Sequence, residues 1–335
     1  MPVNTYLLKR NLAAAVGLLD WKWRRLPAGL YIYNFHRIGD SGETPFDPNV
    51  FSATAEQFTR QLQALSARFR VIGIDDLRKL VESGKQPDEP MALITFDDGY
   101  VDNYTVACPI LRSLDLPAVF FLPTDFIGNQ ALPWWEEAAW IVRNTSRASL
   151  TLPGLDTPVV IDGARMEMSI RQVLRYFKDY PGSSLDEKMV QLKEQCQVAP
   201  DPAAAANLFL DWDQVRKMRD LGMAIGSHTC SHRILSQLRL DEQEQELAES
   251  KRIIEAAIGD EVMSLAYPVG GVETFTAATR QMAEQCGYRL AFSFPVGGGA
   301  SRNPAGCPLA LPRISLDLLH QLPDIQYATV YSRIS

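Results

Sequence analysis

Short apolar runs and amphipathic helical stretches alternate along most of the chain. Between residues 53 and 69, for example, Phe58, Leu62 and Leu65 recur at the spacing of one helical face. Apolar segments of strand length lie at residues 30–35, 71–74, 91–96, 117–122, 223–226, 262–267, 290–294 and 311–315. This order predicts an α/β fold with a parallel sheet and crossover helices. Periodicity alone leaves open whether the sheet closes into a barrel.

The alternation stops between residues 125 and 211. This stretch contains Trp134 and Trp135, a short β-like piece and charged helical segments. A structureless loop of that length is improbable in a compact domain, so we expect an insertion on one face of the main domain. Trp134 and Trp135 are candidates for stacking on sugar rings, although a buried core position is at least as common for tryptophan.

Two groups of ionisable residues follow predicted strands. Asp97 and Asp98 come directly after the strand at 91–96, and His228 and His232 stand four residues apart after the strand at 223–226. Adjacent buried carboxylates are costly unless a cation receives them. Histidines at i and i+4 lie on one face of a helical turn, so we expect them to share a metal ion with Asp98. One carboxylate and two imidazoles leave a coordination position open, which is typical of a hydrolytic site.

These segments resemble the polysaccharide deacetylase family, which shares the NodB homology domain (carbohydrate esterase family 4). Residues 95–99 read TFDDG and match its first motif, residues 228–232 read HTCSH and match its second, and residues 266–270 read AYPVG and resemble a variant third. The resemblance extends over about residues 30–320 and implies a distorted (β/α)7 barrel. The expected organisation is an N-terminal helix at 1–28, a barrel domain at 29–322 interrupted by the insertion at 125–211, and a C-terminal tail at 323–335.

The resemblance also implies roles for the motif residues. Asp98, His228 and His232 would hold one divalent ion; Zn²⁺ suits this donor set best, with Co²⁺, Ni²⁺ or Mn²⁺ as alternatives. Asp97 would be the general base that takes a proton from water made acidic by the ion, or else a further ligand. Tyr267, Pro268 and Val269 would form the loop that stabilises the oxyanion, through the backbone N–H of Val269.

The sequence departs from the family pattern in two places. The third motif often carries an arginine that holds the base, and Ala266 stands there instead. Arg313 is a candidate to supply that guanidinium, with a surface salt bridge as the alternative. The general acid is the second departure: His320 fits a late Leu-x-His motif but reads better as part of a capped helix. We therefore favour His36, which follows the first strand, over His320.

Composition limits the class of protein. The net charge of −7 argues against a nucleic-acid partner. Five dispersed cysteines without CxxC spacing are no disulfide framework and fit a reducing compartment. Cys230, between the two histidines, is interpreted as a packing residue. Residues 1–28 carry an apolar run that is too short to span a membrane. It is interpreted as a packing helix, as a peripheral contact with an anionic membrane surface, or as a secretory signal.

Together these observations predict a metal-dependent N-deacetylase of amino sugars in a polysaccharide or a lipid-linked glycan. The alternatives are a non-catalytic glycan-binding or scaffold protein with the same fold, and an O-acetyl esterase. We expect a cytoplasmic protein, peripheral at the inner membrane surface, with secretion as the remaining option. The glycan substrate is the expected partner, and the oligomeric state is left open.

Overall fold

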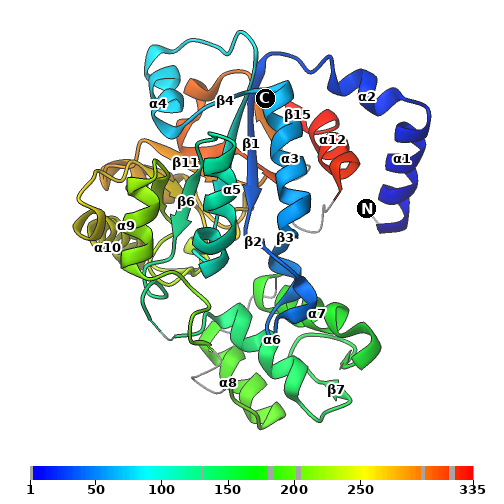
Figure 1. Ribbon diagram of the computed structural model, residues 1–335. Helices are drawn as coiled ribbons and strands as arrows, with labels where there is room; N and C mark the ends of the chain where they lie inside the picture. Colours follow the sequence, from blue (N-terminus) through cyan, green and yellow to red (C-terminus); the bar gives the residue numbers. More distant parts are fainter. Residues whose placement is uncertain are drawn as a thin grey trace.

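The main body of the protein is a barrel of parallel strands surrounded by helices (Figure 1). The computed structural model describes residues 3–129, 131–179, 185–200, 205–295, 299–316 and 321–334. The strands of the barrel are β1 (Gly29–Phe35), β5 (Pro90–Phe96), β6 (Val119–Leu122), β9 (Ala224–Ser227), β10 (Ser264–Ala266), β11 (Leu290–Ser293), β13 (Leu311–Pro312) and β14 (Ile314–Ser315). They pair in parallel in this order, so the α/β prediction is confirmed.

Closure of the barrel depends on one bent strand. Strand β13 pairs with β11, whereas β14 pairs with β1, and only Arg313 separates the two. Residues 311–315 therefore join the last strand to the first and complete a ring of seven. The closure is uneven, because β12 (Gly299–Ser301) pairs antiparallel with the start of β1 and carries β15 (Arg333–Ile334) beside it. This confirms the distorted seven-stranded barrel that the resemblance implied.

Alternating side chains of the strands enter two different cores, as expected for a barrel wall. Leu30 and Ile32 of β1 and Met91 and Leu93 of β5 belong to an inner cluster. The residues between them pack outward against the helices. The same alternation continues to the carboxyl ends of the strands. The polar residues that come after the apolar inner residues of each strand therefore point toward the mouth of the barrel.

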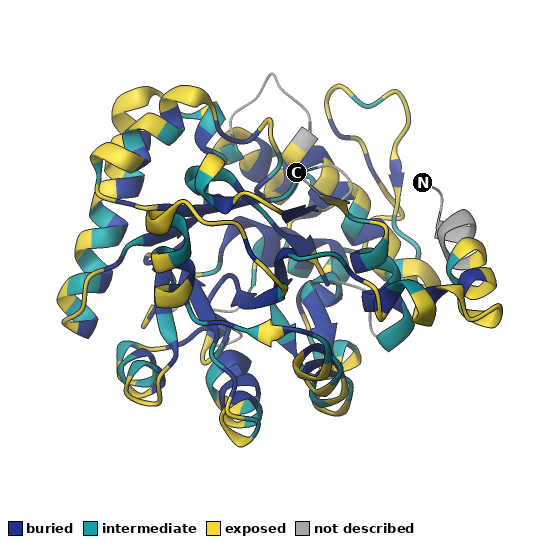
Figure 2. Ribbon diagram, turned by 90° about the horizontal axis from the view of Figure 1, so that it is seen from above, coloured by how far each residue is buried: buried dark blue, intermediate teal, exposed yellow. Residues whose placement is uncertain are grey.

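The outer helices are α3 (Ala55–Arg68), α4 (Ile74–Ser83), α5 (Cys108–Ser113), α9 (Trp212–Asp220), α10 (Leu240–Ile258) and α11 (Ala277–Gln285). Their inward faces are buried and their outward faces exposed (Figure 2). Phe58, Leu62 and Leu65 of α3 are all fully buried, as their spacing predicted. The strand expected at 71–74 is shorter, because β4 ends at Val71 and Ile74 already begins α4. Short strands β2 (Arg37–Ile38) and β3 (Phe51–Ala53) form a separate pair beside the barrel mouth.

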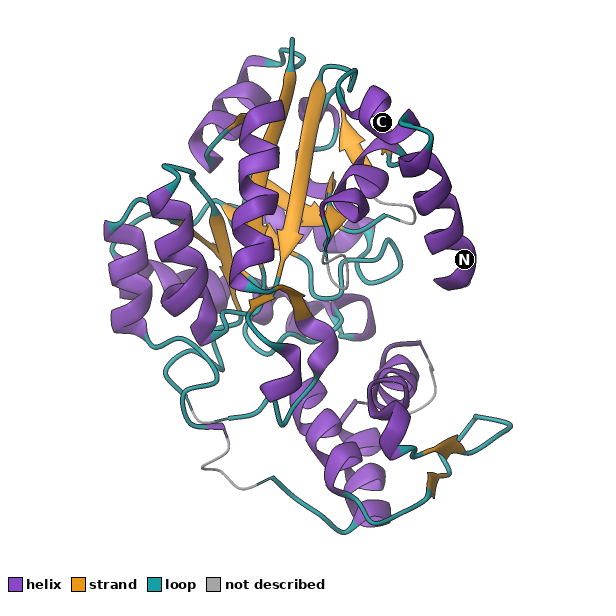
Figure 3. Cartoon of the chain, turned by 45° about the vertical axis from the view of Figure 1, so that its right-hand side comes forward, coloured by secondary structure: helices purple, strands orange, loops and turns teal. Residues whose placement is uncertain are grey.

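The insertion is a compact unit beneath the barrel (Figures 1 and 3). It contains α6 (Trp134–Asn144), α7 (Met166–Asp179), α8 (Leu185–Cys196) and a small antiparallel pair, β7 (Ser149–Leu150) with β8 (Val159–Val160). Its apolar side chains form a core of their own, which Phe46 and Tyr100 of the barrel side join. The returning chain is tied to the first motif, since the Leu210 N–H donates to the carbonyl of Gly99.

The N-terminal helices and the C-terminal helix lie side by side at the barrel flank (Figure 1). Helices α1 (Val3–Ala15) and α2 (Leu18–Trp23) contact α12 (Leu322–Val330), and Arg10 pairs with Asp324. The sequence led us to treat residues 323–335 as a tail, but the described part of this stretch, up to residue 334, forms most of α12 together with β15. None of the helices in the described part of the chain is long and apolar enough to cross a membrane.

Candidate active site

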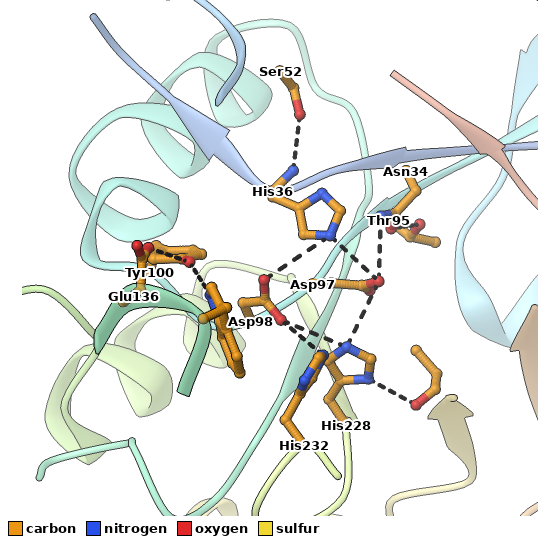
Figure 4. A network of polar contacts seen from close by, with 12 residues as sticks. Asn34, His36, Ser52, Thr95, Asp97, Asp98, Tyr100, Glu136, His228 and His232 are labelled. Carbon is orange, nitrogen blue, oxygen red and sulfur yellow. Dashed lines mark hydrogen bonds and ion pairs between the residues drawn. The ribbon is translucent and has the colours of Figure 1, made fainter. Parts of the chain in front are cut away.

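Most of the predicted site residues meet in a cleft at the carboxyl ends of the strands. Asp97 and Asp98 follow β5, His228 follows β9, and His36 follows β1 (Figure 4). The cleft has a volume of about 540 Å³, and its walls come from both the barrel and the insertion. Parallel barrels gather functional side chains at this end because the loops there vary without disturbing the strands.

The three predicted ligands are arranged as donors to one ion. Asp98 Oδ1 lies 3.6 Å from His228 Nε2 and 3.5 Å from His232 Nε2. Zinc bonds of about 2.1 Å in a tetrahedron separate neighbouring ligand atoms by roughly 3.4 Å, so the spacing fits a shared ion better than direct hydrogen bonds. One atom from each side chain lies within 4.8 Å of the others, and all three residues are buried. The donor set therefore fits a divalent metal.

Hydrogen bonding and burial prepare both imidazoles for this role. His228 Nδ1 lies 2.7 Å from the carbonyl oxygen of Ala266, which can only accept a hydrogen bond, so Nδ1 carries the hydrogen and Nε2 keeps its lone pair toward Asp98. Burial, together with the charges of His228, Lys178 and His36, holds the pKa of His232 well below its ordinary value. Neutral imidazole is the form that binds metal.

His232 is oriented by packing against the insertion. The ring of Trp135 lies against it with centroids 4.4 Å apart. Trp135 Nε1 donates to the hydroxyl of Tyr100 at 2.8 Å, and that hydroxyl donates to Glu136 Oε1 at 2.6 Å (Figure 4). Burial, with the nearby charge of Asp47, raises the pKa of Glu136 to about 8. Packing against the insertion thus fixes the orientation of His232, one of the three predicted metal ligands.

The two histidines do not lie on a helical turn, so that prediction is wrong. Residues 228–232 form a loop in which Thr229 and His232 have positive φ values of 66° and 56°. Glu246 of α10 closes the loop by accepting the backbone N–H groups of Cys230 and Ser231. Four-residue spacing brings the rings together through this clamped turn rather than through helical periodicity.

Cys230 is buried in the same loop and lies outside the donor cluster, as its interpretation as a packing residue predicted. Burial raises the pKa of its thiol to about 12, which disfavours the thiolate that a metal would bind.

Backbone strain is concentrated at this site. Asp98, His232 and Val269 all have left-handed φ values, of 74°, 56° and 63°. Such a conformation costs a residue other than glycine about 1–2 kcal/mol and persists where the surroundings demand it. Gly99 follows with φ 68°, and a Cβ there would come within 2.8 Å of Ile127. The turn after β5 therefore needs this glycine to present Asp98.

Asp97 is held by a buried guanidinium. Arg313 donates to both of its carboxylate oxygens at 2.7 Å, and Asn34 Nδ2 donates to Oδ2 at 3.2 Å. Arg313 is fully buried and extends from the bend between β13 and β14, so the alternative of a surface salt bridge does not apply. Burial alone would raise the pKa of Asp97, but Arg313, His228 and His36 outweigh it and hold that pKa below its ordinary value. Asp97 stays ionised.

His36 reaches the same place from the first strand. Its Nε2 lies 4.0 Å from Asp97 Oδ2 and 3.9 Å from Asp98 Oδ2, and its side chain is 16% exposed toward the cleft. It stands outside the three-residue donor cluster. The rival candidate His320 lies outside the described residues.

The predicted oxyanion loop divides into two parts. Val269 lines the cleft, and among the described residues its backbone N–H has no hydrogen-bond acceptor. Tyr267 instead supports the loop from below: its ring stacks on Phe275 with centroids 4.0 Å apart, and its hydroxyl donates to the carbonyl of Leu309. Pro268 carries the turn, whose closing bond joins the Gly270 N–H to the Pro268 carbonyl.

Trp134 and Trp135 line the cleft but are mostly buried in the core of the insertion. Sequence reasoning missed other participants, chiefly Asn34, Tyr100 and Glu136. Asn34 had a visible signal, since it is an amide within an apolar strand. Tyr100 and Glu136 had none, because their contact joins the barrel to the insertion.

Comparisons with known proteins identify related sequences and folds. The family model described as "Polysaccharide deacetylase" matches residues 84–291. YxkH of Bacillus subtilis (strain 168), provisionally named a polysaccharide deacetylase, is 21% identical over 296 residues, covering 88% of this chain and 75% of YxkH.

Two solved structures share the fold. The Streptococcus pyogenes deacetylase PplD, in complex with acetate, has a TM-score of 0.54 at 19% identity, covering 86% of this chain and 92% of PplD. IcaB from Ammonifex degensii has a TM-score of 0.55 at 17% identity, covering 90% of this chain and 97% of IcaB. Because the family model spans more than half of the sequence, the chain belongs to the polysaccharide deacetylase family.

Proposed function

We propose that this protein is a metal-dependent hydrolase that removes N-acetyl groups from amino sugars of a polysaccharide or a lipid-linked glycan. One observation carries the proposal: Asp98, His228 and His232 converge as metal donors directly beside an ionised Asp97 that is clamped by Arg313. A scaffold protein has no need of a buried, correctly held base next to a donor cluster.

The proposed ion is Zn²⁺, since mixed carboxylate and imidazole donors favour it. Held by Asp98, His228 and His232, it would act as a Lewis acid toward the acyl oxygen and make water more acidic.

The remaining roles belong to the chain itself. Asp97 accepts the proton of the attacking water, and Arg313 with Asn34 keeps its carboxylate facing the cleft. The backbone N–H of Val269, which has no acceptor in the described part of the chain, donates to the carbonyl oxygen as negative charge develops there. His36 donates a proton to the departing amine nitrogen as the C–N bond breaks. The products are acetate and a free amino sugar.

Release of acetate and of a primary amine from N-acetylglucosamine oligomers tests this proposal. Asp97→Asn should lose at least 100-fold in kcat while keeping its bound metal, because the donor cluster is untouched. Asp213→Asn, an exposed carboxylate on α9, is the matched control and should behave as wild type. Unchanged turnover in Asp97→Asn would contradict the assigned base.

The same assay separates the competing functions. Acetate without a new amine, from O-acetylated glycans only, would identify an esterase. Binding of the oligomers with no release of acetate would identify a glycan-binding protein.

We further propose that the N-terminal helices contact an anionic membrane surface on the cytoplasmic side. Leu8, Leu12 and Val16 recur every four residues and are 64–69% exposed, and Trp21 is 52% exposed. Lys22, Arg24 and Arg25 follow immediately. Apolar side chains beside basic ones suit an interface rich in acidic lipid.

Sedimentation with phosphatidylserine vesicles tests this contact. Binding should weaken in Leu8→Asn/Leu12→Asn and at high salt. Equal sedimentation of the variant, or self-association through this face in solution, would contradict the proposal.

A further inference from the structure

One wall of the cleft is strongly basic. Arg171, Arg175 and Lys178 of α7 all line the cavity that holds the proposed metal site. They follow each other at i, i+4 and i+7, so they share one face of the helix. At 1.5 Å per residue the row extends over roughly 10 Å along α7.

The direction of this row is fixed by packing. The opposite face of α7 carries Ile170, Val173 and Phe177, which are buried in the core of the insertion. Rotation of the helix would expose these residues, so the basic face must remain toward the cleft. α7 lies in the insertion beneath the barrel mouth (Figures 1 and 3).

The row ends near the reactive groups. Lys178 lines the same cavity as His228 and His232, so it shares that cavity with the donor cluster. At the other end, Arg171 donates to Asn49 Oδ1 at 2.6 Å, in the segment between β2 and β3. A molecule bound at the donor cluster can therefore extend along these cations within the same cavity.

The row carries an excess of positive charge. Among the described residues, neither Arg171, Arg175 nor Lys178 forms an ion pair with a carboxylate. Three carboxylates line the same cavity. Asp97 is occupied by Arg313 and Asp98 belongs to the donor cluster, which leaves Asp47, whose oxygen Oδ1 accepts from Asn49. Asp47 is thus the one carboxylate of the described cavity wall left to attract Arg171 and Lys178, in a chain whose net charge is −7.

We propose that this row is a subsite for a phosphate or diphosphate ester carried by the acylated amino sugar. A neutral glycan is bound by hydrogen-bonding and aromatic groups and gains little from cations that lack a carboxylate partner. Such cations would also repel the divalent metal ion as it approaches the site. Arginine forks bind phosphate oxygens in pairs and lysine adds a point charge, so the set matches several phosphate oxygens spread along the helix. The inference rests on the proposed function, because it names the substrate class of the same site.

Calorimetric binding to the Asp97→Asn protein tests the subsite without turnover. N-acetylglucosamine 1-phosphate should bind at least tenfold more tightly than N-acetylglucosamine, and the preference should shrink as salt is added. Arg175→Gln and Lys178→Gln should each reduce the preference by about tenfold, the usual loss for a charge-assisted hydrogen bond. Arg165→Gln, an exposed arginine of the same insertion outside this cavity, is the control and should retain it.

Equal binding of the neutral and phosphorylated sugars would overturn the proposal, as would a preference that survives both α7 substitutions. Tighter binding of a disaccharide bearing a uronic acid than of the sugar phosphate would also overturn it. A polyprenyl-diphosphate sugar and a nucleotide-diphosphate sugar both carry the proposed phosphate ester. Whichever of the two binds more tightly identifies the class of molecule that brings this ester to the subsite. Failure here leaves acetate release by the wild-type protein as a separate test of the proposed function.

Discussion

Removing the guanidinium of Arg313 should destabilise the protein far more than removing any surface arginine. Arg313 and Asp97 are 0% and 2% exposed, and two hydrogen bonds of 2.7 Å join them. Loss of one partner from a buried pair leaves the other charge without compensation, which costs about 3–5 kcal/mol. Arg313→Met should lower the free energy of unfolding by this amount, and Asp97→Asn by a comparable amount. Arg313→Lys should retain only part of the free energy of unfolding that Arg313→Met loses, because an ammonium group cannot form the two paired hydrogen bonds.

The double variant isolates the free energy of interaction between Arg313 and Asp97. If the charges compensate each other, Arg313→Met/Asp97→Asn should be more stable than the sum of the single changes by about 3 kcal/mol. Urea unfolding of metal-free protein, followed by circular dichroism, measures all four free energies without a contribution from bound ion. Arg78→Met is the matched control, since Arg78 pairs with Glu82 at the exposed surface, and its effect should be much smaller.

The same pair predicts a pH dependence. The folded-state pKa of Asp97 is depressed, so its stabilising contribution is present above the unfolded pKa of about 3.9 and is lost as the pH falls below it. In Arg313→Met the pKa of Asp97 should rise, because only His228 and His36 then oppose the effect of burial, and this contribution should shrink. The reasoning would be refuted if the two single substitutions had additive effects on the free energy of unfolding and if stability fell in acid equally in wild type and in Arg313→Met.

Three further predictions concern groups around the site. Trp135→Ala should weaken zinc affinity by about 10–100-fold because His232 loses the ring that orients it, whereas Trp135→Phe should retain most affinity; equal affinity in both, measured by competition with a chromophoric chelator, would contradict this. Glu136 has a folded-state pKa of about 8, above its unfolded value, so it costs stability as the pH rises from about 4.5 to 8, up to about 5 kcal/mol. In Glu136→Gln the free energy of unfolding should therefore decline less steeply over that pH range than in wild type. An equally steep decline in both proteins would count against the raised pKa. Gly99→Ala should lower the melting temperature and the metal affinity together, since its Cβ would meet Ile127; wild-type values for both would show that the turn adapts.

The parallel α/β sheet and the positions of its reactive residues were predictable because they depend on local patterns, whereas closure of the sheet into a barrel was implied only by the family resemblance. Strand and helix periodicities alternate along the chain, and carboxyl ends of parallel strands converge, so Asp97, Asp98, His228 and His36 had to meet. The partner of Asp97 was less certain, because Arg313 reaches it through a strand that changes neighbours after Pro312. Periodicity carries no information about such a bend.

The remaining features depend on contacts between segments distant in sequence. The loop at 228–232 is shaped by Glu246, and the orientation of His232 by Trp135 in the insertion. The basic face of α7 was readable as an amphipathic pattern, but its position over the cleft follows from tertiary packing alone. Local sequence determines which residues share a face, and tertiary structure determines what that face meets.

The content of bound metal tests the central claim most directly. Elemental analysis of wild-type protein supplied with zinc should give about one ion per chain. His232→Ala should lose that ion, whereas His36→Ala should keep it, because His36 stands outside the donor cluster. A folded wild-type protein that takes up no metal, or a His232→Ala protein that retains a full equivalent, would contradict a metal site built from Asp98, His228 and His232.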